Sequence, residues 1–248
     1  NHNTAVGSKA LEDNTTGSSN TAVGSLCLTD NTTGVNNTSV GFAALRYNAT
    51  GQSNSAFGSG ALQANLASNN TAFGAYALND NTTGANNVAV GANAADANTT
   101  GGYNIAVGQN SLGANETGNY NIAIGQDALA NNTASNNTAV GRSALVANTT
   151  GGNNTAVGYL ALDANTTAAG NTAVGYDCLS AVTTNTGLTA VGYRALAVSN
   201  GGNNNTAVGY NAGAAISTGG ENIMMGVNSL VSLTTGGQNV AIGHQALE

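Results

Sequence analysis

Hydrophobic and polar residues alternate within a five-residue motif that recurs along the whole chain. The motif reads Asn-Thr-Ala-Val-Gly with small variations, and its Gly stands at positions 7, 24, 41, 58, 74, 91, 108, 125, 141, 158, 175, 192, 209, 226 and 243. These are fifteen copies; twelve of the fourteen intervals are 17 residues and two are 16. A fixed period of this kind indicates a repeat protein, in which each repeat packs on its neighbours. Residues 1–248 are therefore expected to form a single repeat array.

The consensus unit, N-T-A-V-G-x-x-A-L-x-x-N-T-T-G-x-N, contains two extended stretches and two turns. Val, Ile, Phe and Thr at alternating positions favour strands, and Asn and Gly favour turns because both tolerate positive φ. Seventeen residues are too few for a propeller blade. The pattern predicts an all-β fold, a parallel β-solenoid or β-roll of about fifteen 17-residue coils, with coils about 4.8 Å apart.

Positions are numbered here from the motif Gly, which is position 0. Position −1 is Val, Ile or Phe in fourteen copies, position −3 exchanges Thr with Val and Ile, and position +4 is Leu in thirteen copies. These three columns are predicted to form the core. Asn recurs at −4 and +7, and stacked Asn side chains can hydrogen-bond along a ladder and to the turns. The Asn-x-Ser/Thr triplets that this repeat generates also match glycosylation acceptors, which stays an alternative.

Positions −2 and +3 carry small residues almost throughout. Columns that stay small suggest close packing against another surface, so we expect them to face away from the core and to contact neighbouring copies of the chain in a homo-oligomer. Cys27 and Cys178 both occupy +3, nine coils apart, too far for a disulfide within the chain. They either replace Ala or pair between chains. The predicted interface residues are Ala22, Ala139, Ala156, Ala173, Cys27 and Cys178.

Composition excludes several classes of function. Charged residues make up 6% of the chain and the net charge is −7, which is unsuited to binding nucleic acid. The sequence has no apolar run long enough for a transmembrane helix. His2 and His244 stand at opposite ends, and the four Lys and Arg residues are scattered. No catalytic constellation, metal site or cofactor site can be assembled, so we expect no enzymatic activity.

Aromatic residues gather in one column of the later repeats. Position +1 is Tyr in four consecutive units, and stacked coils would align the rings along one edge of the solenoid. A flat aromatic row can bind sugar rings. It can also be a surface ladder that only stabilises the coil stack, and both interpretations remain open. The candidate ligand-binding residues are Tyr159, Tyr176, Tyr193 and Tyr210.

Segments such as Asn121-Ile122-Ala123-Ile124-Gly125 and Asn239-Val240-Ala241-Ile242-Gly243 resemble the repeat of trimeric autotransporter adhesin heads. Similar arrays occur in phage tail-fibre-like and bacterial surface proteins. The resemblance covers all fifteen repeats and implies a left-handed β-roll in a trimer, with the small columns at the threefold interface. It also implies an extracellular place, on a cell surface or virion fibre, and a structural or adhesive role, with a host glycan or receptor as partner. The chain is then expected to be a fragment of a longer fibre. The repeat departs from the adhesin pattern in being longer.

Ice binding is an alternative from a different class, because rows of Thr on a flat solenoid can match a lattice. The exchange of Thr with Ile and Val at −3 argues against it, since it suggests that this Thr column is not a free surface.

Overall fold

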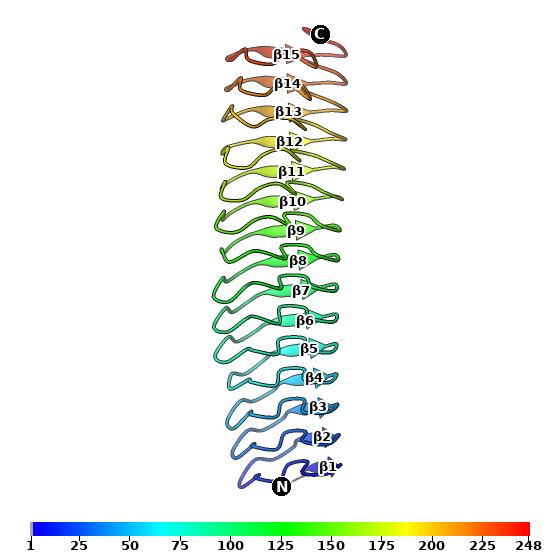
Figure 1. The fold of residues 1–248 in the computed structure, drawn as a ribbon, viewed down its shortest axis with the longest axis vertical. Helices are drawn as coiled ribbons and strands as arrows, with labels where there is room; N and C mark the ends of the chain where they lie inside the picture. The colour runs from blue at the N-terminus through cyan, green and yellow to red at the C-terminus, as the bar shows by residue number, and fades with distance from the viewer. Residues whose placement is uncertain (1) are drawn as a thin grey trace. The chain divides into compact units, whose positions relative to one another are not determined.

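The computed structural model describes residues 2–248 and shows an all-β protein (Figure 1). One strand of three residues occurs in each repeat, and no helix occurs within residues 2–248. The predicted parallel β-solenoid, with one repeat per coil, is confirmed. The strands are β1 Thr4–Val6, β2 Thr21–Val23, β3 Thr38–Val40, β4 Ser55–Phe57, β5 Thr71–Phe73, β6 Val88–Val90, β7 Ile105–Val107, β8 Ile122–Ile124, β9 Thr138–Val140, β10 Thr155–Val157, β11 Thr172–Val174, β12 Thr189–Val191, β13 Thr206–Val208, β14 Ile223–Met225 and β15 Val240–Ile242.

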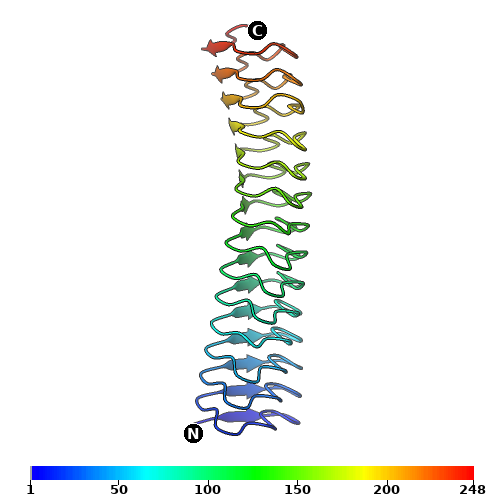
Figure 2. The same cartoon turned by 90° about the vertical axis from the view of Figure 1, so that its left-hand side faces the viewer.

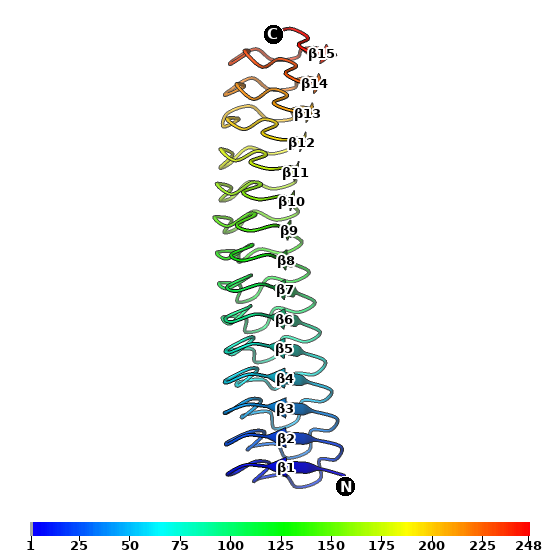
Figure 3. The same cartoon turned by 90° about the vertical axis from the view of Figure 1, so that its right-hand side faces the viewer.

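The chain divides into two compact units, Asn1–Ala123 and Ile124–Glu248, which are described separately. The first contains β1–β7 and the second β9–β15, while β8 contains the boundary. Within each unit consecutive strands pair in parallel, and equivalent positions lie opposite one another, as Thr155 does with Thr172. Figures 2 and 3 show the strands of each unit stacked coil upon coil. Each repeat position therefore forms a column along its unit.

Positive φ angles recur at positions −5, 0, +2 and +4 and fix the bends of the coil. The Gly at position 0 has φ between 129° and 143° throughout. A Cβ on Gly41 would lie 2.5 Å from the carbonyl oxygen of Gly58 in the next coil, so only Gly fits. Leu at +4 also has positive φ, 53° at Leu145 and 52° at Leu162. This conformation costs about 1–2 kcal/mol for a residue with a Cβ. Complete burial of these Leu side chains offsets that cost.

The interior of each coil is filled by the small columns and by Leu. Ala156 at −2, Ala161 at +3 and Leu162 at +4 are all 0% exposed, and equivalent residues are buried in every coil except the first and the last. Val157 at −1 and Thr155 at −3 are half-exposed instead. The predicted core was therefore right for Leu and wrong for −1 and −3. These columns point outward, and the small columns are small because the interior of the coil is narrow.

Both predicted Asn ladders are confirmed. At −4, the Asn154 amide nitrogen donates to the carbonyl of Ala168 at 2.8 Å, and its oxygen accepts from the Asn171 backbone N–H at 3.0 Å. At +7, the Asn148 amide donates to Asn132 Oδ1 at 2.7 Å and to the Gly151 carbonyl at 2.8 Å. Most buried amides thus satisfy one another and the turn backbone, and the exceptions in the +7 ladder are Asn115 Oδ1 and Asn165 Oδ1, which have no partner within residues 2–248.

Candidate functional site

The four tyrosines at +1 form a continuous stack in the second unit. Ring centroids lie 5.4 Å apart from Tyr159 to Tyr176, 5.2 Å from Tyr176 to Tyr193 and 5.0 Å from Tyr193 to Tyr210. The interplanar angles are 21°, 8° and 7°. We call these residues the Tyr ladder. Its side chains are 39–49% exposed, so the aligned aromatic row expected from the sequence exists at the surface.

The stacking limits what the Tyr ladder can offer a ligand. Near-parallel rings at these separations are offset-stacked, and Tyr176 and Tyr193 each have a neighbouring ring on both faces. A sugar ring therefore cannot stack on the face of an inner rung in the way the sequence suggested. The inner rungs present ring edges and phenol hydroxyls to solvent.

The two arginines of the second unit both lie at the Tyr ladder. The Arg142 guanidinium carbon lies 6.0 Å from the ring centroid of Tyr159, at the first rung. Arg194, at +2, pairs with Asp177 of the preceding coil, with 3.2 Å between Nε and Oδ2. The ion pair neutralises Arg194 and Asp177, which directly follow Tyr193 and Tyr176 in the sequence.

Sequence reasoning missed a second tyrosine stack, in the first unit. The rings of Tyr103 and Tyr120 lie 5.1 Å apart with an interplanar angle of 14°. Both residues stand at position −5 of consecutive coils, five residues before Gly108 and Gly125. The signal was the same 17-residue spacing that revealed the Tyr ladder, but in another column. This stack has two rungs and occupies a turn.

The predicted interface residues lie inside the coils. Ala22, Ala139, Ala156, Ala173, Cys27 and Cys178 are all 0% exposed within the single chain. A side chain without exposed surface cannot contact a partner, so this expectation is corrected: the small columns fill the interior.

The two cysteines are buried free thiols. The Cys27 sulfur lies 2.7 Å from the hydroxyl oxygen of Ser39, which replaces Ala at −2 of the next coil. Burial raises the pKa of the Cys27 thiol and raises that of Cys178 to about 12. Neither thiol is placed to pair between chains, and both are poor nucleophiles in the folded state.

The outward face of the strands is formed by positions −3 and −1, which were predicted from the sequence to lie in the core. Thr138, Thr155, Thr172, Thr189 and Thr206 form five in-register rungs at −3, with β-branched residues beside them at −1. Both columns are half-exposed or exposed in the two units. The exchange of Thr with Ile and Val therefore does not place this column in the interior of the coil. We call positions −3 and −1 the Thr/Val face.

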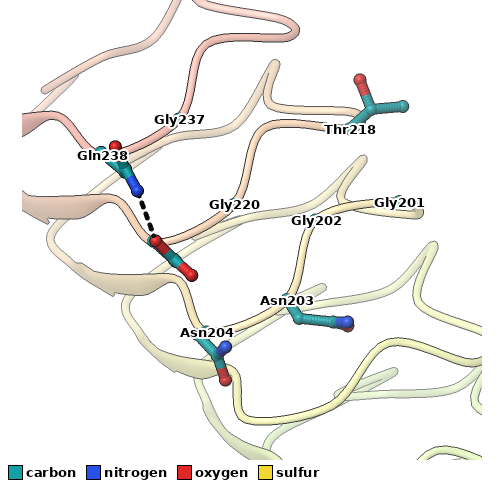
Figure 4. Close-up of a pocket in the computed structure, with 9 residues that line it drawn as sticks. Gly201, Gly202, Asn203, Asn204, Thr218, Gly220, Gly237 and Gln238 are labelled. Atoms are coloured by element: carbon teal, nitrogen blue, oxygen red, sulfur yellow. Dashed lines mark hydrogen bonds between the residues drawn. The ribbon is translucent and has the colours of Figure 1, made fainter.

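A groove of about 440 Å³ lies at the turns of the last coils (Figure 4). Its lining includes Gly201, Gly202, Gly220 and Gly237, which have no side chains to fill the space. At its edge Gln238 donates to Glu221 at 2.9 Å. The groove contains one acidic group and no cation, so it offers hydrogen bonds but no catalytic arrangement.

Asp96 and Asp163 are half-buried carboxylates. Burial raises the pKa of Asp96 and of Asp163, and one Asp163 oxygen is buried without a hydrogen-bond partner. Within residues 2–248 no three His, Cys, Asp or Glu side chains come together as a metal site. The described part of the chain contains no helix that is long and apolar enough to cross a membrane.

Comparison with known proteins assigns no family. No protein-family model matches the sequence, and no curated protein matches it. The candidate sites are therefore the Tyr ladder and the Thr/Val face, and their interpretation rests on their geometry.

Proposed function

We propose that this chain is a structural segment of an extracellular fibre, in which copies of the chain associate through their Thr/Val faces. The fibre would act as a spacer, so that attachment or display takes place at a distance from the cell or virion surface. We further propose that the assembly is a trimer of left-handed coils, as the resemblance to adhesin heads suggests. The observation that carries the proposal is the half-exposed, apolar Thr/Val face.

The composition of this face supports association. Positions −3 and −1 contain only Thr, Ser, Val, Ile, Phe and Met in all fifteen repeats, with no charge. A sheet face that remains in water usually carries polar residues. Phe73, Val90 and Ile124 at −1, all in inner coils, are 46%, 39% and 40% exposed. Contiguous apolar surface of this kind is typical of an interaction site.

A second copy of the same chain is the partner whose repeat matches. Its rows have the same spacing, so every rung of one face can meet an equivalent rung of the other without loss of register. Uncharged rows also avoid the repulsion that identical charges would produce at each coil.

The mass of the chain in solution tests the proposal. Light scattering after size exclusion is expected to give three times the chain mass. Replacing Val157 and Val174 by Lys puts two charges on the face and is expected to give a folded monomer. Thr150→Lys, on an exposed turn, is the matched control and should leave the assembly intact. A wild-type monomer would contradict association through this face.

Ice binding is a second candidate, favoured by the outward position of the Thr rows. Five in-register Thr residues and the neighbouring β-branched column make a repeating array of hydroxyl and methyl groups. Association and ice binding need the same face, so they exclude each other. A monomer with thermal hysteresis that is lost in the Val157→Lys, Val174→Lys variant would support ice binding. A trimer without hysteresis would support the fibre.

The extracellular location is tested separately on the source cells or virions. Added protease or an impermeant label should reach the chain on intact particles. Protection until the particles are opened would contradict it.

A further inference from the structure

We infer that the Tyr ladder binds a neutral, extended polysaccharide of β-1,4-linked sugars, which lies parallel to the ladder with one sugar for each rung. The inference concerns Tyr159, Tyr176, Tyr193 and Tyr210 alone. It is independent of whether the Thr/Val face joins copies of the chain.

The spacing of the rungs selects an extended polymer. Successive rings of the ladder are separated by 5.4, 5.2 and 5.0 Å. A fully extended β-1,4-linked pyranose chain advances by nearly the same distance at each sugar, because its linkages are equatorial. Because the ladder has only four rungs, four successive sugars can each lie close to one rung.

The exposed atoms of the ladder select a ligand rich in hydroxyl groups. The inner rings have their faces against one another, which leaves ring edges and phenol hydroxyls for the ligand. No protein group within residues 2–248 hydrogen-bonds to any of these four hydroxyls. Each phenol can both donate and accept, and every sugar of an extended polysaccharide presents hydroxyl groups along its edges. One such hydrogen bond contributes little in water, but four on one polymer act together.

The charges around the ladder select a neutral polymer over an anionic one. Asp177 and Arg194 neutralise each other beside the rings, and Asp163 lies near enough to Asp177 for the two carboxylates to repel. The second unit has five acidic side chains and only two arginines. Arg142 at the first rung is therefore too little positive charge to hold a polyanion. A neutral chain incurs no repulsion along the row.

The test compares hydroxyl removal in the two tyrosine stacks. Wild-type protein is expected to be retained by microcrystalline cellulose or chitin and slowed in gels that contain hydroxyethyl cellulose. The variant Tyr176→Phe, Tyr193→Phe keeps the ring stack but loses two hydroxyls, and retention should fall roughly tenfold. The matched control Tyr103→Phe, Tyr120→Phe removes hydroxyls from the two-rung stack and should bind as wild type.

Ligand length and charge give two further readouts. A soluble hexasaccharide should compete well and a disaccharide poorly, because only the longer chain spans the four rungs. Three results would overturn the inference: no retention of the wild type on either solid, equal retention of the Tyr176→Phe, Tyr193→Phe variant, or retention by dextran sulfate alone. Light scattering on the same samples reports the assembly state, so failure of the fibre proposal is recognised separately.

Discussion

Met224 occupies the space that Gly213 leaves open in the preceding coil. Gly213 stands at +4, where thirteen other coils have Leu, and Met224 stands at −2, where thirteen have Ala. A Cβ on Gly213 would collide with the Met224 sulfur, and Met224 is 0% exposed. A large residue missing from one column is thus replaced by a large residue from another, so the interior of the coil stays filled.

This relationship predicts strong coupling between the two positions. Met224→Ala alone leaves a cavity and should destabilise the fold by about 3 kcal/mol. Gly213→Leu alone overpacks the interior and should cost about 2 kcal/mol. The double variant restores the consensus pair of Leu at +4 and Ala at −2, and other coils hold Leu at the same positive φ. Its loss of stability should therefore be smaller than the sum of the losses of the two single variants. Denaturant unfolding of all four proteins measures the coupling, and strict additivity would contradict direct packing.

The Asn ladder at +7 should not tolerate an apolar residue in its middle. Asn148 donates to Asn132 and Gly151, and its own oxygen accepts from Asn165 at 2.7 Å. Asn148→Leu would leave buried partners without hydrogen bonds, at a cost of about 3 kcal/mol. Later coils hold Val182 and Ile216 at this position, but there the ladder has already ended.

Chemical denaturation checks this prediction against an exposed Asn. Asn131→Leu removes one surface hydrogen bond, to the Val146 carbonyl, and is expected to cost under about 1 kcal/mol. An equal loss of stability in the two variants would contradict the larger contribution that we expect from the buried ladder.

Asp163 should make the fold less stable as pH rises. Burial raises its pKa above the ordinary 3.8, so the folded state binds its proton more tightly than the unfolded state. Its stabilising effect is therefore complete below 3.8 and is lost as pH rises through the folded pKa. Asp163→Ala should raise the melting temperature at pH 7, and the gain should disappear towards pH 3.

The same column already contains Ala130 and Ala197, so the substitution fits the coil. Glu221→Ala, on an exposed turn, serves as the control and should show no comparable gain at pH 7. A gain for Asp163→Ala that is equal at both pH values would point to packing, with no contribution from titration.

The two thiols should be unreactive until the protein unfolds. Cys27 and Cys178 are 0% exposed, and burial holds the pKa of Cys178 near 12, so little thiolate forms. A thiol reagent is expected to modify neither in native buffer and both in denaturant. Rapid modification of either cysteine in native buffer, or a disulfide-linked dimer on a non-reducing gel, would contradict the burial of the +3 column.

The period of the sequence predicted the fold because every repeat carries the same local information. Gly at position 0 is required by its positive φ and by the next coil, and the Asn columns could be assigned to ladders from their regularity. Leu at +4 was assigned to the interior correctly. The Tyr ladder followed from four residues at one spacing.

The side on which each column lies could not be derived in this way. Ala156 and Val157 are neighbours in a strand of three residues, and alternation alone allows either to be inside. Small size at a column is consistent with an external contact and also with a narrow interior. An exchange of Thr with Val is likewise consistent with burial and with an outward sheet face, which accepts both residues.

Periodicity and local conformation are enough to predict the coil length, the parallel in-register stacking, the positions of the turns and the alignment of equivalent side chains. The folded coil settled which columns fill the interior, since that depends on how the Gly and Leu bends close the coil around a space wide enough for Ala beside Leu. It also decided that the Tyr rings turn their faces to one another, because ring orientation is set by the neighbouring coil.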